Sequence, residues 1–520
     1  MNMRTAKLLL QGLGAAILLM ISHLAALVSP YHAVLYHSVL PMRSVVWGTL
    51  IDLAVASALA ALLFGYLQKR QTGVLTLVWV FIAARIAHTT VGIASSTFGW
   101  NIPHLTPSSA AIVTLVVGLT LWSLRPPAYR AAVRALLALL ILAGCNAVWM
   151  VPQLVYLGLQ PQRSGAVGPT AHPVLASDQR SPKNDGRIVW LLFDELSYDQ
   201  TFEHRFPGLS MPSFDEFRSQ SVVFSDLKPV GMNTDLVIPG LFLGKPVAKI
   251  RSDLNGMPTL QLVGSQQWQS FDAQATLFAE AQRQGWTTGV VGWFNPYCRI
   301  LAGTLDYCFW RMGSGELDGP ISTRSSLQNA MSPIQNMIGW VEGKPSFLRQ
   351  AQQADLAAIV PAATALIRDQ NIRFVFIHLP VPHPPGIYDR RTGTVRGGGT
   401  YIDNLALSDR VMGELMSSID ATPLAGKTTV IVCSDHSWRL GIWQGLGLWS
   451  REEEIATGGR FDPRPVLMIH LPGEQAGHVV SEPFDEIRIH EIIERMLRGQ
   501  DPGLDKALLA GAGLPAAPKP

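Results

Sequence analysis

A series of apolar segments in the first third of the chain constrains its fold more than any other feature. Residues 1–157 contain one acidic residue, Asp52, and five segments that are each long enough, at about 20 residues, to cross a bilayer as a helix. We place these segments at 8–28, 46–67, 74–96, 106–124 and 133–157. The sequence therefore predicts a multi-pass α-helical membrane domain of five helices over residues 1–157.

Basic residues predict the orientation of this domain. Arg4 and Lys7 precede the first segment, whose apolar stretch is too long for a cleaved signal peptide, so we interpret it as an uncleaved anchor. Further basic residues flank the ends of the predicted spans that would lie on the same side of the membrane as the N-terminus. The loops on the opposite side carry almost no charge. We expect a cytoplasmic N-terminus in a bacterial-type inner membrane and an extracytoplasmic position for everything after about residue 158.

One charge lies near the middle of the third segment. An unpaired Arg85 at that depth would cost at least about 2.5 kcal/mol. We expect Arg85 to pair with Asp52 or to bind a lipid phosphate.

The rest of the chain has the composition of a globular domain with a linker and a tail. Residues 158–186 are rich in Gly, Pro and Ser, as expected of a linker, and residues 501–520 form a low-complexity, flexible tail. The net charge of +3, without a basic cluster, gives no support for a nucleic-acid partner.

Residues 187–500 alternate apolar strand patterns with amphipathic helical patterns. Continuous apolar runs such as "RIVWLLF", "RFVFIHL" and "TTVIVCSD" are separated by segments such as "NLALSDRVMGELMSSID". This alternation predicts an α/β domain with a mainly parallel sheet that is covered on both faces.

Two of the predicted strands end in metal-ligand residues. "VWLLF" is followed by Asp194 and Glu195, and "TVIVCS" is followed by Asp435 and His436. Carboxylates and an imidazole at strand ends suit a divalent cation, although an Asp after a strand can also serve as a helix N-cap.

A hydroxyl residue precedes an apolar helical run in "GMNTDLVIPGLFLG", residues 231–244. Thr234 follows a short loop there and is placed at a helix N-terminus. It is either a simple N-cap or a nucleophile whose phosphoryl adduct the helix N-terminus would stabilise.

The order of these segments resembles the sulfatase-like branch of the alkaline phosphatase superfamily, whose membrane members include phosphoethanolamine transferases and lipoteichoic acid synthases. The acidic strand end at 194–195 is followed by "MPSFDEFRSQSVVFSD", a Thr-x4-Pro segment at 234–239, "FIHLPVPHPP", "YIDNLALSD" and "SDHS". The resemblance implies an alkaline-phosphatase-like catalytic domain over 187–500.

The resemblance also implies the composition of a site. Thr234 would be the nucleophile and, once deprotonated, a metal ligand beside Asp435 and His436, with Asp194 and Glu195 both candidates for the remaining ligand. His383 would contact the substrate phosphate or protonate the leaving group, and Asn233 would contact the substrate. The implied cofactor is one divalent metal, with Zn²⁺ favoured because His436 joins the carboxylates and with Mn²⁺ or Ca²⁺ as alternatives. We expect His378 and His490 to be structural.

Two departures from the family pattern bear on function. Ser437 stands where the family usually has Gly, so the loop that carries His436 is expected to differ. Thr234 stands where sulfatases have a Cys or Ser that becomes an aldehyde, and a Thr cannot form that aldehyde, which argues against sulfate ester hydrolysis.

The resemblance thus implies a membrane-bound transferase. It would move a phosphoethanolamine or phosphoglycerol headgroup from a phospholipid to an envelope glycan or lipid through a phospho-threonine intermediate. The alternatives are a membrane-anchored phosphodiesterase or sulfatase-like hydrolase, and an inactive scaffold in envelope polysaccharide assembly.

Two of the four cysteines lie close together in "NPYCRILAGTLDYC". On the predicted extracytoplasmic side, Cys298 and Cys308 are expected to form a disulfide, and two unrelated buried thiols are the alternative.

Overall fold

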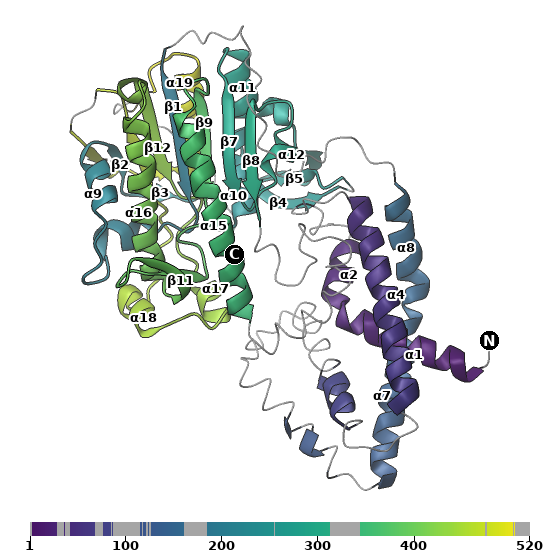
Figure 1. Cartoon of the computed structure of the whole chain (residues 1–520). Helices are drawn as coiled ribbons and strands as arrows, with labels where there is room; N and C mark the ends of the chain where they lie inside the picture. The colour runs from purple at the N-terminus through teal and green to yellow at the C-terminus, as the bar shows by residue number, and fades with distance from the viewer. Residues whose placement is uncertain are drawn as a thin grey trace. The chain divides into compact units, whose positions relative to one another are not determined.

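The computed structural model divides into two compact units (Figure 1). Of the described residues, the first unit contains those up to Gln160 together with Lys344, and the second contains the others. The residues that the structure describes are 3–28, 36, 42–67, 76–84, 86, 115–116, 118–120, 123, 126–160, 185–253, 255–312, 344–473, 476–502 and 504.

The first unit is helical. Its helices are α1 (Met3–Leu19), α2 (Ile21–Val28), α4 (Met42–Leu67), α7 (Pro126–Cys145) and α8 (Ala147–Leu159). Two helical stretches of this unit, Val45–Tyr66 and Pro126–Leu159, are long and apolar enough to cross a membrane. They correspond to the second and fifth of the predicted spans.

Five membrane spans were predicted, and in the described residues two segments are long and apolar enough to be spans. The first expected span, 8–28, is interrupted at Met20. It falls on α1, of 17 residues, and α2, of 8 residues, and each helix is shorter than the roughly 20 residues that a bilayer requires. The third and fourth expected spans lie mostly outside the described residues.

Small residues allow close packing between the helices of this unit. A side chain on Gly14 of α1 would collide with the backbone carbonyl of Leu140 on α7, so the two helices can approach this closely only with glycine there. Asp52 is buried on α4, whereas its expected partner Arg85 lies outside the described residues.

The second unit is built on a sheet of eight strands, and the predicted α/β class with a mainly parallel sheet is confirmed. The strand order is β14-β2-β13-β12-β1-β9-β7-β8, and β13 alone runs antiparallel to its two neighbours. The strands are β1 (Arg187–Phe193), β2 (Val222–Phe224), β7 (Thr288–Trp293), β8 (Tyr307–Arg311), β9 (Phe374–Leu379), β12 (Thr428–Cys433), β13 (Leu467–His470) and β14 (His478–Val480).

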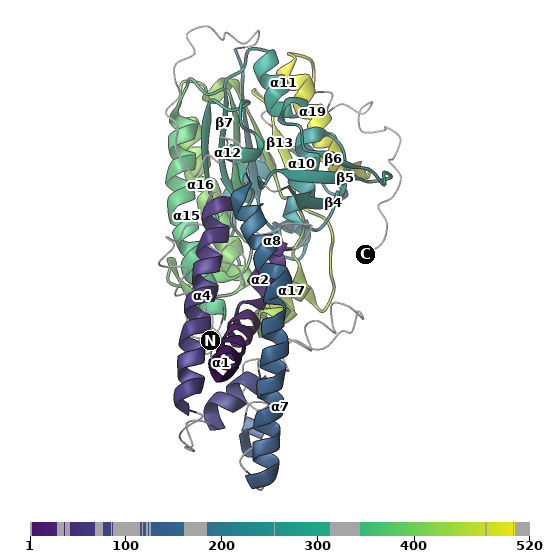
Figure 2. The same ribbon diagram turned by 90° about the vertical axis from the view of Figure 1, so that its right-hand side faces the viewer.

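Helices cover both faces of this sheet (Figure 2). On one face, α9 (Pro212–Ser219), α15 (Lys344–Arg368) and α16 (Tyr401–Asp420) pack on the side chains of Val189, Leu191 and Phe193. On the other lie α10 (Thr234–Leu243), α11 (Leu277–Arg283) and α19 (Ile489–Leu497), where Trp190 and Phe376 contact Phe242 edge to face. Both faces of β1 are thus buried, which accounts for its continuous apolar sequence.

Shorter elements surround the sheet. They are β3 (Leu227–Lys228) with β15 (Phe484–Asp485), the antiparallel sheet β4 (Val247–Ser252), β5 (Pro258–Leu262) and β6 (Trp268–Ser270), the hairpin β10 (Gly386–Asp389) and β11 (Thr394–Gly399), and helices α12 (Tyr297–Ile300), α17 (Leu440–Gly445) and α18 (Arg451–Thr457), together with single turns at Asp199–Glu203, Ala273–Ala275, Ala425–Lys427 and Glu486–Arg488.

The three central strands place their carboxyl ends side by side. β1 pairs in parallel with β12 on one side and with β9 on the other. Segments that are distant in sequence, after residues 193, 379 and 433, therefore meet at one edge of the sheet, where open α/β sheets usually carry their sites.

Candidate active site

Three of the predicted ligands converge at this edge. Asp194 follows β1, and Asp435 and His436 follow β12; one ligand atom from each lies within 4.8 Å of those of the other two. All three side chains are fully buried. The parallel pairing of β1 with β12 is what brings these residues together.

The donor set fits a divalent cation. Asp194 Oδ1 and Asp435 Oδ2 are buried oxygens without a hydrogen-bond partner among the described residues. Burial raises the pKa of both carboxyls, and their mutual repulsion raises that of Asp194 further. A buried pair of carboxylates with unsatisfied oxygens is stabilised by a cation, and two oxygens with one imidazole nitrogen are a suitable ligand set.

The tautomer of His436 also suits metal binding. Its Nδ1 lies 3.0 Å from the backbone carbonyl of Ser437, which can only accept, so Nδ1 carries the proton. The lone pair of Nε2 then faces the carboxylates, 3.2 Å from Asp435 Oδ2. Burial lowers the pKa of the imidazole well below its usual value, which keeps it neutral. Ser437, expected to alter this loop, has no positive φ, so the backbone does not require glycine there.

Thr234 places its hydroxyl in the same cluster. Its Oγ1 lies 3.4 Å from Asp194 Oδ2 and 3.3 Å from His436 Nε2. Both neighbours accept hydrogen bonds, so both draw on the single hydroxyl proton. Thr234 is the first residue of α10, and the N-cap is Asn233, so the interpretation of Thr234 as an N-cap is wrong.

The loop before α10 is held from the far end of the chain. The buried Glu486 accepts a hydrogen bond of 2.8 Å from the backbone N–H of Val230. Asn233, expected to contact substrate, is exposed, and its side chain makes no capping bond to α10. Its role in substrate binding stays a prediction.

Glu195 does not belong to the ligand cluster. Its backbone has φ 68°, a left-handed conformation that is rare for a residue with a side chain. In this conformation its carboxylate accepts hydrogen bonds from Arg439 Nε at 2.6 Å and from Trp443 Nε1 at 3.1 Å. Burial raises the pKa of Glu195 to about 7, and Arg439 opposes that shift. Of the two acids kept as alternatives, Asp194 is the one that lies in the cluster.

His378, expected to be a core histidine, lies at the site. Its Nε2 is 3.4 Å from Asp194 Oδ2 and forms no hydrogen bond within the part of the chain that the structure describes, while its Nδ1 is 2.7 Å from the hydroxyl of Tyr297. Burial lowers the pKa of His378 to about 4. Its place near the carboxyl end of an apolar run is visible in the sequence, but the pairing of that strand with β1 is shown only by the structure.

His383 lies in the loop after β9. Its Nδ1 is 2.7 Å from the carbonyl of Pro384, so Nδ1 carries the proton and Nε2 is left as an acceptor. Burial lowers the pKa of His383 well below its usual value. A neutral His383 in this tautomer can take a proton at Nε2 but cannot donate one there. The side-chain amides of Asn404 and Gln352 each donate to the His383 carbonyl and so hold the loop.

Cys298 and Cys308, the pair proposed from the sequence, are joined in a disulfide with their Cα atoms 5.6 Å apart. The bridge ties α12 to β8, and α12 begins with Tyr297, the hydrogen-bond partner of His378. The disulfide therefore fixes a residue that supports the site.

A single hydroxyl links the two strand-end loops. Ser434 Oγ accepts a hydrogen bond from the N–H of Leu196 at 2.8 Å and donates to the carbonyl of His436 at 2.7 Å. All of these groups are buried.

We expect Ser434→Ala to lower the free energy of unfolding by about 1–3 kcal/mol, because it leaves a buried N–H and a buried carbonyl without partners. Chemical denaturation monitored by tryptophan fluorescence measures the change. Ser417→Ala, which removes an exposed hydroxyl bonded to Gly413, is the matched control and should have little effect. Equal stability of the two variants would contradict this account.

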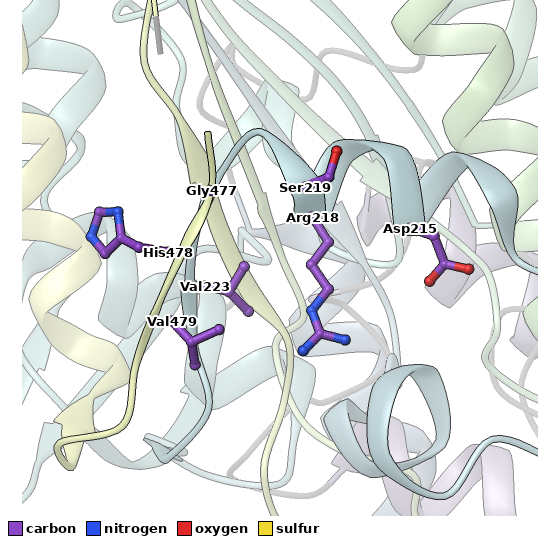
Figure 3. A pocket seen from close by; sticks show the side chains of 7 residues that line it. All are labelled: Asp215, Arg218, Ser219, Val223, Gly477, His478 and Val479. Carbon is purple, nitrogen blue, oxygen red and sulfur yellow. The ribbon is translucent and has the colours of Figure 1, made fainter. Parts of the chain in front are cut away.

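A surface pocket lies elsewhere on this unit (Figure 3). Its lining, from α9, β2 and the segment that enters and forms β14, consists of Asp215, Arg218, Ser219, Val223, Gly477, His478 and Val479. None of these is a residue of the cluster around Thr234.

Comparison with known proteins gives structural neighbours only. No model of a known protein family matches the chain, and no curated protein matches it. Similar solved structures include a phosphonate monoester hydrolase of Agrobacterium radiobacter (13% identity, 60% of this chain and 74% of that chain, TM-score 0.37). Others are a protein in the alkaline phosphatase superfamily from Vibrio parahaemolyticus (13%, 66% and 73%, TM-score 0.37) and a sulfatase from Pseudoalteromonas sp. (12%, 64% and 70%, TM-score 0.38).

One of these neighbours is thus described as a member of the superfamily that the sequence motifs resemble. At these TM-scores the similarity assigns neither a substrate nor a reaction to this chain.

Proposed function

We propose that this chain is a membrane-anchored, metal-dependent transferase. It moves a headgroup of the phosphoethanolamine or phosphoglycerol type from a phospholipid to an envelope glycan or lipid. The observation that carries the proposal is the position of the Thr234 hydroxyl, which lies at a helix N-terminus and within hydrogen-bond distance of both Asp194 and His436.

Asp194, Asp435 and His436 would hold the metal, with Thr234 as a further ligand. When bound, a divalent cation, for which we favour Zn²⁺, neutralises phosphate charge and lowers the pKa of a coordinated hydroxyl. The N-terminus of α10 adds backbone N–H groups that favour a negatively charged adduct on its first residue.

The reaction has two displacements at phosphorus. In the first, Thr234 Oγ1 bonds to the headgroup phosphorus and the bond from phosphorus to the diacylglycerol oxygen breaks; the proton that Thr234 loses ends on that oxygen, which leaves as diacylglycerol. In the second, the oxygen of an acceptor hydroxyl bonds to the same phosphorus and the bond to Thr234 Oγ1 breaks; the proton that the acceptor loses ends on Thr234, which is thereby restored. The tautomer of His383 suits the second step, because its free Nε2 can take the acceptor's proton.

Two features support the cellular setting. The first unit contains two stretches that meet the length and hydropathy of a membrane span, and the second contains a disulfide. Disulfides are typical of compartments outside the cytoplasm. A membrane anchor would also keep a lipid donor at high effective concentration.

The test is to trap the intermediate. The full-length protein in detergent is incubated with phosphatidylethanolamine or phosphatidylglycerol without an acceptor, and its peptides are then weighed by mass spectrometry. We expect a headgroup phosphate on the peptide that bears Thr234, with release of diacylglycerol, and the added mass identifies the donor.

Thr234→Ala, treated in the same way, should remain unmodified. Diacylglycerol release without any adduct on Thr234 would contradict the covalent route. Steady release of free headgroup phosphate would make water the acceptor and the protein a phosphodiesterase.

A further inference from the structure

One partly buried cation, Arg439, lies beside the site and has no role in the two displacements proposed above. Arg439 comes three residues after His436, and 16% of its side chain is exposed. Its Nε donates a hydrogen bond of 2.6 Å to Glu195, the residue after Asp194, and its Nη1 lies 3.4 Å from the carbonyl of Met232, two residues before Thr234.

Glu195 fixes the orientation of this guanidinium. The left-handed backbone of Glu195 turns its carboxylate away from the metal ligands and toward Arg439 Nε, at 2.6 Å. Trp443 Nε1 donates to the other carboxylate oxygen, and the hydroxyl of Tyr401 donates to the Glu195 carbonyl at 2.8 Å. A conformation that is unfavourable in isolation is thus held by three contacts, as is common at functional sites.

The edge of the Arg439 guanidinium that carries Nη1 and Nη2 retains N–H groups that can donate to a ligand. Arg439 Nη1 makes one long contact of 3.4 Å, to the carbonyl of Met232, and no partner of Nη2 is found among the described residues. Met232 lies two residues before Thr234, so this edge of Arg439 adjoins the loop that delivers the nucleophile. A guanidinium edge with free N–H groups binds two phosphate oxygens at once, which an ammonium cannot do.

The charges of the site call for such a donor. A divalent cation would balance the charges of Asp194 and Asp435, and Glu195 balances the charge of Arg439 through its hydrogen bond to Nε. A phosphodiester brings a further negative charge into this region. The Nη edge of Arg439 is then the group whose N–H donors can bind the phosphate oxygens.

The geometry points to Arg439 as the residue that binds the non-bridging oxygens of the substrate phosphate, with Glu195 as the residue that positions it. This deepens the proposed function and rests on it: the substrate is an anionic phosphate ester, and Arg439 selects for its charge and shape.

The test compares Arg439→Gln and Arg439→Lys in the full-length, metal-loaded protein. Inorganic phosphate is the probe, measured by calorimetry and as a competitive inhibitor of the hydrolysis of bis(4-nitrophenyl) phosphate. We expect Arg439→Gln to weaken phosphate binding and to raise KM by about 10- to 100-fold, the range for loss of charged hydrogen bonds. Arg439→Lys should fall between Arg439→Gln and the wild type.

A structural role for Arg439 predicts a different result. Arg205, which forms a two-bond ion pair with Asp215, is the matched control, and Arg205→Gln should leave phosphate binding unchanged. Added guanidinium ion should restore phosphate binding to Arg439→Ala, whereas ammonium should not. Metal content and melting temperature are measured for each variant. If Arg439→Gln has lost its metal or melts at a lower temperature, the phosphate affinity of Arg439→Lys decides instead.

Normal phosphate binding by a folded, metal-loaded Arg439→Gln would overturn the inference even if Thr234 forms its adduct. Conversely, weakened phosphate binding in that variant would uphold anion binding by Arg439 even if no adduct forms on Thr234. The failure of this inference is thereby distinguishable from the failure of the proposed function.

Discussion

Thr234→Ala is expected to lower the turnover of a phosphodiester by at least about 1,000-fold, the scale on which removal of a nucleophile acts. The reason is that the substitution removes Oγ1, the oxygen that lies among Asp194 and His436 and that would form the bond to phosphorus. Turnover of bis(4-nitrophenyl) phosphate by the purified protein gives the measurement.

The fold and the metal should survive this substitution. The substitution removes the hydroxyl and the γ-methyl group of a buried side chain, a small loss of volume, and the three residues assigned as the main ligands are untouched. Thr234→Ser, which keeps the hydroxyl, is the matched control and should retain measurable turnover and form the adduct. Wild-type turnover in Thr234→Ala would rule out covalent catalysis by this residue.

Asp435→Asn is expected to weaken the binding of the divalent metal by at least about 100-fold. Loss of a residue that only orients a metal ligand lowers metal affinity by about 10- to 100-fold, and loss of a ligand carboxylate should lower it more. Asp194→Asn should have a similar effect, because Asp194 shares the cluster. Elemental analysis after dialysis, followed by titration with Zn²⁺, measures both variants.

Glu195→Gln is the control that discriminates between the two adjacent acids. Its carboxylate is engaged by Arg439 and Trp443, so this variant should keep its metal. In metal-free protein, Asp435→Asn should be neutral or stabilising in thermal unfolding, because it removes one of two buried carboxylates that repel each other. Retention of a full equivalent of metal by Asp435→Asn, or its loss from Glu195→Gln, would refute the ligand assignment.

The sequence by itself determined the fold class of the second unit and the strand ends and helix N-terminus at which its candidate site residues lie. Continuous apolar runs separated by amphipathic segments are a local signal, and they predicted a mainly parallel sheet. Because parallel strands end at one edge, the acids after residues 193 and 433 could be expected to meet. Thr234 could likewise be placed at a helix N-terminus, since a loop with Gly and Asn precedes an apolar helical run.

Local patterns could not determine the direction of β13 or the break at Met20. The run "PVLMIHL" is as apolar as its parallel neighbours, yet it pairs antiparallel with both β12 and β2. Strand direction depends on how the connecting chain crosses the sheet. The first predicted span is similarly apolar on both sides of Met20, so composition gave no sign that the helix is interrupted.

Only the tertiary structure chose between Asp194 and Glu195 and brought Arg439 and His378 to the site. Two adjacent acids after a strand are equally suitable as metal ligands from the sequence alone. The left-handed backbone at Glu195 is what directs its carboxylate to Arg439 and leaves Asp194 in the cluster. That backbone conformation is held by Tyr401, Trp443 and Arg439, which lie more than 200 residues away in the chain. His378 reads as a core residue until β9 is paired with β1, which sets its imidazole 3.4 Å from Asp194. Short-range sequence patterns predict strands and helix ends. Which side chains face the site depends on contacts between segments that are distant in the chain.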